Sequence, residues 1–467
     1  MKLYNTLGRQ LKEFVPITPG RVKLYTCGPT VYDYQHIGNY SGYIYWDILV
    51  RQLVANGLKV KRVMNITDVG HLMSDADEGD DKLEQGAARE GKSAREIADL
   101  YAKDFLASMK ALNLVEPDIY AKATDYIDEQ LKVIKILVDR GFAYQTKQAV
   151  YFDVSKLDDY GKLTGQKLSD KEVGARPEVV TDEQKHNPQD FGLWFFAVGR
   201  FAGHQMRWPS PWGEGFPGWH IECTAIVHAT LGEPIDIHTG GVDHIGTHHT
   251  NEIAQTEAAF GKPLATFWLH NNHMMINGQK MAKSAGNFIT LEDLADKGYS
   301  PMDFKMLVLG SHYRNQSNFT WEALEAAKNR LATLRAFAAL RWQVVPGSGG
   351  KAASLNADII KGALEDDLNT PLALAAISGY VAIALDRGIY ESNRSEYENI
   401  LSMIDQYLGL SLGSEEDIDS QLKEFVAQRE RARQSKDWLR ADELRAKLDE
   451  RGIEVNDTPN GPIWYRL

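Results

Sequence analysis

The chain has 467 residues, of which 43% are hydrophobic and 25% are charged, and its formal net charge is −12 at pH 7. This length predicts several domains, and the acidic balance argues against a protein that coats nucleic acid nonspecifically. The start "MKLYNTLGRQLKEF" lacks the apolar core of a signal peptide, no run of about 18 apolar residues predicts a membrane span, and a total of two cysteines is typical of a reducing compartment. We therefore expect a cytoplasmic protein that does not bind membranes.

The predicted elements of the first part of the chain alternate between strand and helix. Residues 22–26, "VKLYT", alternate like a strand, and residues 40–57 carry apolar side chains at helical spacing up to a glycine. The stretch "KVKRVMNITDV" at 59–69 again has strand character. This strand–helix–strand order predicts a parallel α/β sheet. Residues 70–92 are acidic and contain glycines, and they predict a surface excursion.

The middle of the chain predicts an insertion between two halves of that sheet. Residues 94–141 have the pattern of two amphipathic helices, and "AVYFDV" at 149–154 predicts a strand. Residues 153–218 are rich in Gly, Pro and Trp and have poor periodicity, so we expect irregular structure there. The second half of the sheet is predicted as a strand, a helix and a strand, at 235–241, 248–261 and 267–277.

The C-terminal part predicts helices and a final hairpin. The stretch "VVPGSGGKAAS" at 344–354 has the composition of a linker, and helical patterns follow at 355–408 and 419–451. The last 16 residues predict a hairpin around "PNG". The segment 421–451 carries nine Lys and Arg against seven Asp and Glu, which fits a solvated helix face as well as a nucleic-acid contact.

The stretch "CGPTVYDYQHIGN" at 27–39 places Cys27 at the C-terminal end of a predicted strand, just before a helix. That edge of an open α/β sheet is where ligands bind. His36 and Asn39 would face the free N–H groups of the helix start, which attract phosphate, and Gly38 would let a flat ring approach. The alternative is a histidine satisfied within a turn beside a buried cysteine.

The stretch "GQKMAKSAGN" at 278–287 places Lys280 and Lys283 in a glycine-flanked loop. Two ammonium groups three residues apart suit a polyphosphate whose charge grows during a reaction. The chain contains no Walker pattern, so this is not a P-loop. Taken alone, the two lysines fit simple solvation equally well.

Histidines concentrate between residues 220 and 273, which hold eight of the thirteen in the chain together with Cys223. Within the predicted helix, His248 and Glu252 are four residues apart, and His249 and Glu252 are three apart. Either pair would point two ligands at one ion from a single helix face. The pattern alone leaves metal binding, acid–base chemistry and packing open.

The two loop stretches together resemble the His-Ile-Gly-His and Lys-Met-Ser-Lys-Ser signatures of class I aminoacyl-tRNA synthetases. Asn39 replaces the last histidine of the first signature, and Ala282 replaces the first serine of the second. The remaining signature positions are present, namely His36, Gly38, Lys280, Lys283 and Ser284.

The stretches "LYTCGPTVYDYQHIGN", "GWHIECTAI" and "DIHTGGVDHIGTHHTNEIAQTEA", and the tail from "ARQSKDW" to "NGPIW", are similar to the cysteinyl-tRNA synthetase family over nearly the whole chain. The resemblance implies an enzyme that activates L-cysteine with ATP and Mg²⁺ and transfers it to tRNA(Cys). It also implies one Zn²⁺ per chain and a monomer. The zinc would select the substrate as thiolate, because a hydrophobic pocket separates cysteine from its analogues poorly.

The resemblance also implies roles for individual residues. The zinc ligands would be Cys27, Cys223, His248 and Glu252, which decides between His248 and His249. The residues acting on the phosphates would be His36, Gly38, Asn39, Lys280, Lys283 and Ser284. The pocket for the amino acid and nucleotide would include Thr67, Trp219, His238 and Asp243. Weaker claims belong to His220, His228, His270 and His273, and no function is carried onto 70–92, whose "DADEGDDK" misplaces the glycine and ligands of a calcium loop.

We expect a Rossmann-like parallel-sheet catalytic domain with an insertion, followed by an α-helical tRNA-binding region. The expected division is a first catalytic half, a connective insertion, a second catalytic half, a stem-contact region, a helical bundle and a C-terminal anticodon-binding domain, at 1–125, 126–209, 210–275, 276–343, 355–412 and 413–467. The nearest rival is a cysteine ligase of the mycothiol-biosynthesis type, which lacks the helical tail. A non-catalytic paralogue would lack the motif residues, and a zinc hydrolase of the HExxH class lacks its motif here.

Overall fold

Five strands from distant parts of the sequence pair in parallel to form the central sheet of this computed structural model, which describes residues 1–70, 82–165, 182–281, 286–345, 357–458 and 461–466. Their order across the sheet is β11-β10-β3-β4-β5. The strands are β3 (Arg21–Thr26), β4 (Lys59–Ile66), β5 (Ile119–Lys122), β10 (Ile235–Gly241) and β11 (Ala265–Asn271).

The strand order reverses direction between β3 and β10. From β3 the chain moves outward to β4 and β5, and it later returns to the other side of β3 with β10 and then β11. The helices that follow β3 and β10 therefore leave the sheet on either side of this pair. Such a reversal opens a crevice at the carboxyl ends of the two strands, where ligands bind in α/β proteins.

Alternating side chains of the strands supply two separate cores. Leu24 and Leu269 face α1 (Ile37–Ala55), whereas Tyr25 and Trp268 face α5 (Trp219–Thr230) and α6 (His248–Phe260). Burying one large apolar side chain stabilises the fold by about 1.5–3 kcal/mol, so the helices packed on both faces stabilise the sheet. The predicted fold class is confirmed.

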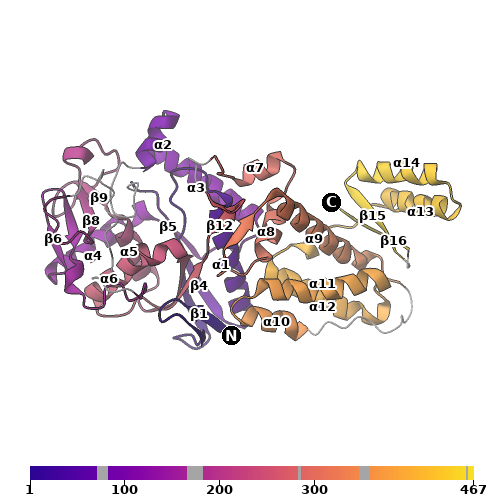
Figure 1. The fold of residues 1–467 in the computed structure, drawn as a ribbon, viewed down its shortest axis with the longest axis horizontal. Helices are drawn as coiled ribbons and strands as arrows, with labels where there is room; N and C mark the ends of the chain where they lie inside the picture. The colour runs from indigo at the N-terminus through magenta and orange to yellow at the C-terminus, as the bar shows by residue number, and fades with distance from the viewer. Residues whose placement is uncertain (71–81, 166–181, 282–285, 346–356, 459–460, 467) are drawn as a thin grey trace.

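A four-stranded antiparallel sheet occupies the insertion, in the order β6-β7-β8-β9 (Figure 1). Its strands are β6 (Ala143–Gln145), β7 (Ala149–Phe152), β8 (Phe191–Phe196) and β9 (Gly215–Pro217). The prediction of irregular structure over 153–218 was wrong for β8 and β9. All six residues of β8 are buried, so the strand has no polar alternation that periodicity could detect.

Three further expectations need correction. The region 94–141 contains α3 (Ala94–Ala111) and α4 (Ile127–Asp139), but β5 lies between them as an edge strand of the central sheet. The acidic excursion includes the helix α2 (Lys82–Glu90), while residues 71–81 lie outside the described part of the chain. The strand expected at 267–277 is two strands, because β12 (Met274–Ile276) belongs to a different sheet from β11.

The N-terminus forms a hairpin that the sequence did not predict. Its strands are β1 (Lys2–Asn5) and β2 (Gln10–Glu13), paired antiparallel. The side chain of Asn5 donates to the Thr266 carbonyl at 2.9 Å and accepts from the Trp268 N–H at 3.0 Å, which attaches the hairpin to β11.

Helices make up most of the C-terminal part, to the right in Figure 1. They are α7 (Leu291–Asp296), α8 (Pro301–Leu309), α9 (Trp321–Ala339), α10 (Ala357–Glu365), α11 (Thr370–Arg387), α12 (Arg394–Leu408), α13 (Ser420–Gln434) and α14 (Trp438–Asp449). Three short strands pack beside them, β12 between β13 (Gln279–Lys280) and β14 (Ser317–Phe319), and the chain ends in the hairpin of β15 (Ile453–Thr458) and β16 (Gly461–Arg466). In the described part of the chain no helix combines the length and apolarity needed to cross a bilayer.

The helices α10, α11 and α12, which follow the predicted linker, are not a separate body. Leu364, Leu374 and Tyr397 belong to the same hydrophobic core as Ile44 of α1. The fully buried Lys305 also joins the two parts. Its ammonium group lies 3.2 Å from an Asp47 carboxylate oxygen and donates to backbone carbonyls that include that of Gly409, after α12. Because the core is shared, a chain that is truncated at 344–354 would lose α10, α11 and α12 and expose the apolar side chains that pack against them.

Candidate functional site

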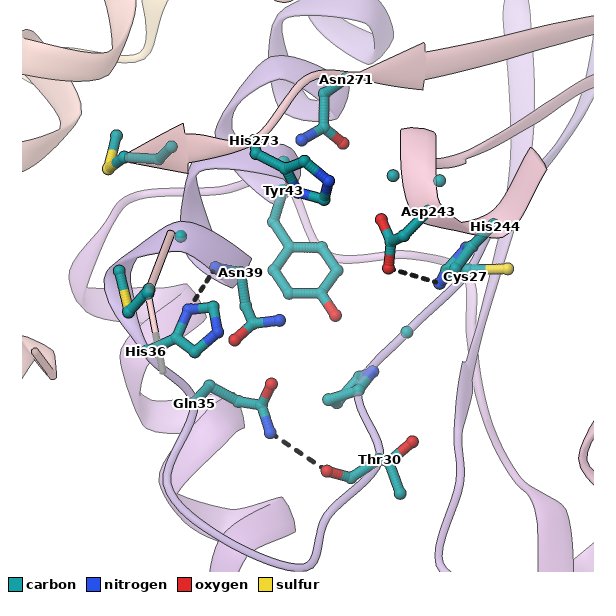
Figure 2. A pocket seen from close by; sticks show the side chains of 18 of the residues that line it. Cys27, Thr30, Gln35, His36, Asn39, Tyr43, Asp243, His244, Asn271 and His273 are labelled. Carbon is teal, nitrogen blue, oxygen red and sulfur yellow. Dashed lines mark hydrogen bonds and ion pairs between the residues drawn. The ribbon is translucent and has the colours of Figure 1, made fainter. Parts of the chain in front are cut away.

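A cavity of about 370 Å³ lies at the carboxyl ends of β3 and β10, where the strand order reverses. Figure 2 shows side chains facing this space from the segments that follow β3 and β10, from the end of β11 and from the start of α1. Nine residues singled out from the sequence line it: Cys27, His36, Gly38, Asn39, Trp219, Asp243, His248, His273 and Lys280.

The start of α1 forms one wall. The His36 side chain caps the helix, and its Nδ1 accepts a hydrogen bond from the Asn39 N–H at 3.1 Å. A Cβ atom on Gly38 would lie 3.0 Å from the His36 ring, so only glycine lets the ring take this position without a shift. Burial lowers the pKa of His36 to about 4, so the ring is neutral at pH 7 and its Nε2–H remains available as a donor.

Lys280 lies across the cavity mouth on β13 and is exposed. The other lysine and the serine of the second motif, Lys283 and Ser284, lie outside the described residues. We refer to His36, Asn39 and Lys280 as the rim. Asn39 is exposed like Lys280, and His36 is intermediate, so the rim meets solvent directly.

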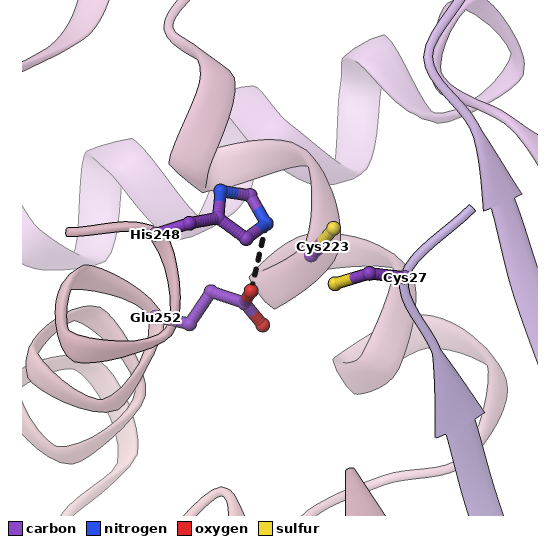
Figure 3. Close-up of side chains that lie close together, drawn as sticks. All are labelled: Cys27, Cys223, His248 and Glu252. Atoms are coloured by element: carbon purple, nitrogen blue, oxygen red, sulfur yellow. Dashed lines mark ion pairs between the residues drawn. The ribbon is translucent and has the colours of Figure 1, made fainter. Parts of the chain in front are cut away.

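Cys27, Cys223, His248 and Glu252 form a buried cluster, the floor cluster (Figure 3), which reaches the cavity through Cys27 and His248. One ligand atom from each lies within 4.8 Å of the ligand atoms of the other three. Cys27 follows β3, Cys223 lies on α5, and the other two occupy the first turns of α6. All four are at most 7% exposed. Two sulfurs, one imidazole and one carboxylate form a donor set that suits a tetrahedral zinc ion.

The charges in the floor cluster also suit a cation. Burial raises the pKa of Cys27, and so does its hydrogen bond to Cys223. Burial opposes the charge on Cys223 as well, but Cys27 and His248 lower the pKa of Cys223 to about 6. Burial likewise opposes a charge on Glu252, yet His238 and His248 hold its pKa well below the usual range. Two anionic side chains therefore face the same buried point.

The two adjacent histidines face different partners. The Nε2 of His248 lies 2.9 Å from Glu252 Oε1, and its Nδ1 lies 3.1 Å from the Nδ1 of His220. Glu252 Oε1 nevertheless has no hydrogen-bond partner among the described residues, so these atoms face each other as two ligands of one ion would. The Nε2 of His249 instead lies 3.2 Å from the Cys27 sulfur.

A second group of potential ligands overlaps the floor cluster: Cys27, His238, His249 and Glu252. Its two histidines each contact one residue of the floor cluster, because His238 Nε2 lies 2.8 Å from Glu252 Oε2 and His249 reaches Cys27. Such contacts are typical of outer partners that orient metal ligands. Burial lowers the pKa of His249 and of His270 well below the ordinary range, so these rings are neutral.

The four residues expected in the substrate pocket divide into two pairs. Trp219 and Asp243 line the cavity, and the Trp219 ring packs on His248 with 4.3 Å between ring centroids. Thr67 and His238 are buried behind it and are not among the described residues that line it. Thr67 donates to Glu222 at 2.8 Å, so Thr67 and Glu222 support the wall of the cavity from behind.

Sequence reasoning missed several lining residues. Tyr43 and Trp46 face the cavity from α1, and Asn271 faces it from the end of β11, next to His273, which the sequence had offered with a weaker claim. Asn39, Tyr43 and Trp46 follow one another at four and three residues on the predicted helix, so helical periodicity from the first motif could have found this face.

Comparison with known proteins is consistent with this geometry. Residues 13–329 match the family model of the tRNA synthetases class I (C) catalytic domain, and residues 415–466 match the cysteinyl-tRNA ligase anticodon binding domain. The cysteine–tRNA ligase of Treponema denticola is 41% identical over 500 aligned positions that cover 100% of both chains. That of Thermus thermophilus is 41% identical over 480 positions, covering 99% of this chain and 98% of the relative.

Among solved structures, the methionyl-tRNA synthetase of Mycobacterium tuberculosis in complex with methionyl-adenylate has the same fold, with a TM-score of 0.60 at 15% identity over 84% of this chain and 92% of that one. The leucyl enzyme of Agrobacterium radiobacter, in a ternary complex with tRNA, also gives a TM-score of 0.60, at 11% identity and 86% coverage of both chains. The chain therefore belongs to the cysteine–tRNA ligase family of class I aminoacyl-tRNA synthetases.

Proposed function

We propose that the chain joins L-cysteine to tRNA(Cys) at the expense of ATP, and that the floor cluster selects the cysteine by holding one Zn²⁺. A carboxylate oxygen of cysteine attacks the α-phosphorus of ATP and displaces diphosphate, which gives cysteinyl-AMP. A hydroxyl of the terminal tRNA adenosine then attacks the carbonyl carbon and releases AMP. The observation that carries the proposal is the convergence of two thiols, an imidazole and a carboxylate below a cavity of synthetase type.

The donor chemistry of the floor cluster supports the choice of zinc. Cys27 and Cys223 are soft ligands that favour zinc over magnesium or calcium, and His248 and Glu252 complete a set of four. The ion would supply a preference for a soft thiolate over the hydroxyl of serine, together with a lowered pKa of the substrate thiol. Hydrophobic contacts alone separate such similar substrates by only about 1–3 kcal/mol.

The rim provides what adenylate formation requires. The free N–H groups at the start of α1 and the Nε2–H of the neutral His36 are donors for phosphate oxygens. Lys280 adds positive charge for the departing diphosphate, and we assign the same role to Lys283 and Ser284 on the basis of the sequence. Mg²⁺ enters with ATP. The start of α1 and its cap His36 are in place before substrate arrives, and attack by the substrate's own carboxylate needs no protein nucleophile.

Substrate cysteine would lie between the rim and the floor cluster. The carboxylate of Asp243 faces the cavity and suits the α-ammonium group of the amino acid, while Trp219 closes the side next to His248. Thr67 and His238 act from behind the wall, through Glu222 and Glu252 respectively. In this proposal the thiol of the substrate lies at the floor cluster and its carboxylate lies at the phosphates.

The C-terminal part would hold the tRNA. The side chain of Trp438, at the start of α14, is 56% exposed, and Leu439 beside it is 76% exposed. The Arg433 guanidinium lies 5.8 Å from the centre of the Trp438 ring. An exposed indole with a neighbouring cation suits stacking on an unpaired base. We retain the six-segment division of the chain, the cytoplasmic location and the monomeric state as parts of this proposal.

Metal analysis combined with cysteine-dependent ATP–diphosphate exchange tests the proposal. We expect about one zinc per chain and an exchange reaction that cysteine supports and serine does not. After replacement of zinc by Co²⁺, two cysteine ligands predict a sulfur-to-cobalt charge-transfer band that weakens in Cys223→Ser. An undiminished band in Cys223→Ser would instead favour the overlapping group that contains His238 and His249. Exchange that proceeds at full rate without metal would refute the selection mechanism.

A further inference from the structure

The N-terminal hairpin reaches the back of the floor cluster through Thr6, which follows β1. The Thr6 N–H donates to the Trp268 carbonyl at 2.9 Å, and the neighbouring Asn5 binds the Thr266 carbonyl and the Trp268 N–H of the same strand. Thr6 is 9% exposed. Its hydroxyl is therefore held at a fixed place beneath the central sheet.

Three hydrogen bonds connect this hydroxyl to a floor sulfur. Thr6 Oγ1 lies 2.7 Å from His270 Nδ1, His270 Nε2 lies 2.8 Å from His249 Nδ1, and His249 Nε2 lies 3.2 Å from Cys27 Sγ. A Cβ atom on Gly240 would lie 2.6 Å from the His249 ring, so the glycine lets that ring pack against β10.

Proton positions along this path follow from the chemistry at its two ends. A cysteine that ligates zinc is a thiolate and only accepts, so His249 Nε2 must carry the proton. A neutral imidazole has one donor and one acceptor, so His249 Nδ1 accepts from His270 Nε2–H. His270 Nδ1 then accepts in turn, and the hydroxyl of Thr6 is the donor that completes the series.

We infer that Thr6, His270 and His249 are positioning residues that hold a hydrogen-bond donor on the sulfur of Cys27. The inference rests on the proposed zinc site. The donor fixes the direction of the thiolate, so that the sulfur is already oriented toward the ion before it binds. Outer partners of this kind typically change metal affinity by about 10–100-fold.

The test compares Thr6→Val with Thr6→Ser in the full-length chain. Valine has the shape of threonine without the hydroxyl, whereas serine keeps the donor. We expect Thr6→Val to weaken zinc binding, measured by competition with a chelator, by about tenfold. The charge-transfer band of the Co²⁺ form should also shift. Thr6→Ser should match the wild type in both measurements, and thermal melts establish that each variant is folded.

His270→Gln separates positioning from packing. The glutamine amide can donate to His249 without a partner that fixes its tautomer, so Thr6→Val should have little effect on zinc binding in that background. A loss of affinity that persists there is a packing effect and overturns the inference. Equal zinc affinity and equal spectra in Thr6→Val and the wild type also overturn it. If the wild type bound no zinc, the proposed function would fail first, and this inference with it.

Discussion

The floor cluster and the rim lie in one cavity but are built on opposite principles. All four floor residues are nearly inaccessible, and they contact one another or further buried histidines. The rim residues Asn39 and Lys280 are exposed, and their proposed partners are substrate phosphates. To select one amino acid, the site must keep its ligand geometry fixed when a different amino acid binds. Stabilisation of phosphate charge requires donors that the substrate itself covers.

The largest expected effect is at the floor. Cys223→Ser should lose most of its zinc and nearly all cysteine-dependent exchange, because a hydroxyl is a poor replacement for a thiolate. Zinc content and exchange rate are the measurements. His228→Ala, on the same helix but half exposed and paired with Glu233, is the matched control and should keep both. Full zinc occupancy in Cys223→Ser would show that Cys223 is not a zinc ligand.

The next effect is at the rim. Lys280→Ala should lower kcat for adenylate formation by about 10²-fold and leave the cysteine concentration at half-maximal rate nearly unchanged, because its charge acts on the transition state. Lys262→Ala, an exposed lysine after α6, controls for the loss of a surface charge. A variant with normal kcat and weakened cysteine binding would contradict the division between rim and floor.

A third region separates from both. Trp438→Ala should weaken the binding of tRNA by about 1–3 kcal/mol, the free energy of stacking one base, and so slow charging at limiting tRNA. Zinc content and diphosphate exchange should not change. Leu439→Ala removes a more exposed but non-aromatic neighbour and should cost less. Charging assays at limiting tRNA give the comparison. Equal losses in the two variants would argue against stacking.

The smallest effect concerns the protonation of His36. Because burial lowers its pKa to about 4, the ring acts at pH 7 as a neutral donor rather than a cation. His36→Gln keeps an N–H donor, so exchange should slow by only about threefold, which corresponds to a weakened rather than a lost hydrogen bond. The ratio of the two rates should stay constant between pH 6 and pH 8. A ratio that grows as the pH falls would mean that the ring works in its charged form.

The sequence predicted the elements that carry the cavity better than those at its edges. The stretch "IDIHTGG" coincides with β10. Its first five residues are buried and include β-branched side chains, and a pair of glycines ends the strand. The edge strand β5 has four residues, of which only Ala121 is buried, and so gave no pattern. The apolar run at 267–277 continues past Asn271 although the chain there changes sheets, which a periodicity argument does not detect.

For the site, the family resemblance supplied the candidate residues, while spacing left open which of two adjacent histidines faces the floor cluster. His248 and His249 both lie in the first turn of a helix that is buried all round, so no amphipathic face separates them. What distinguishes them is the atom that each ring faces, and this depends on β3 and β11. The resemblance also implied Thr67 and His238 as pocket residues, but both are buried and contact Glu222 and Glu252 instead of lining the cavity.

The parallel pairing of β3 with β10 has a consequence for synthesis of the protein. At roughly 5–20 residues per second, β10 leaves the ribosome some 10–40 seconds after β3. Until then the inner edge of β3 is an open row of backbone donors and acceptors, a template for pairing with other chains. Cys27, at the end of that edge, has no second thiol beside it until Cys223 has also emerged. The nascent chain thus completes the pairing of β3 and the floor cluster within the same short interval.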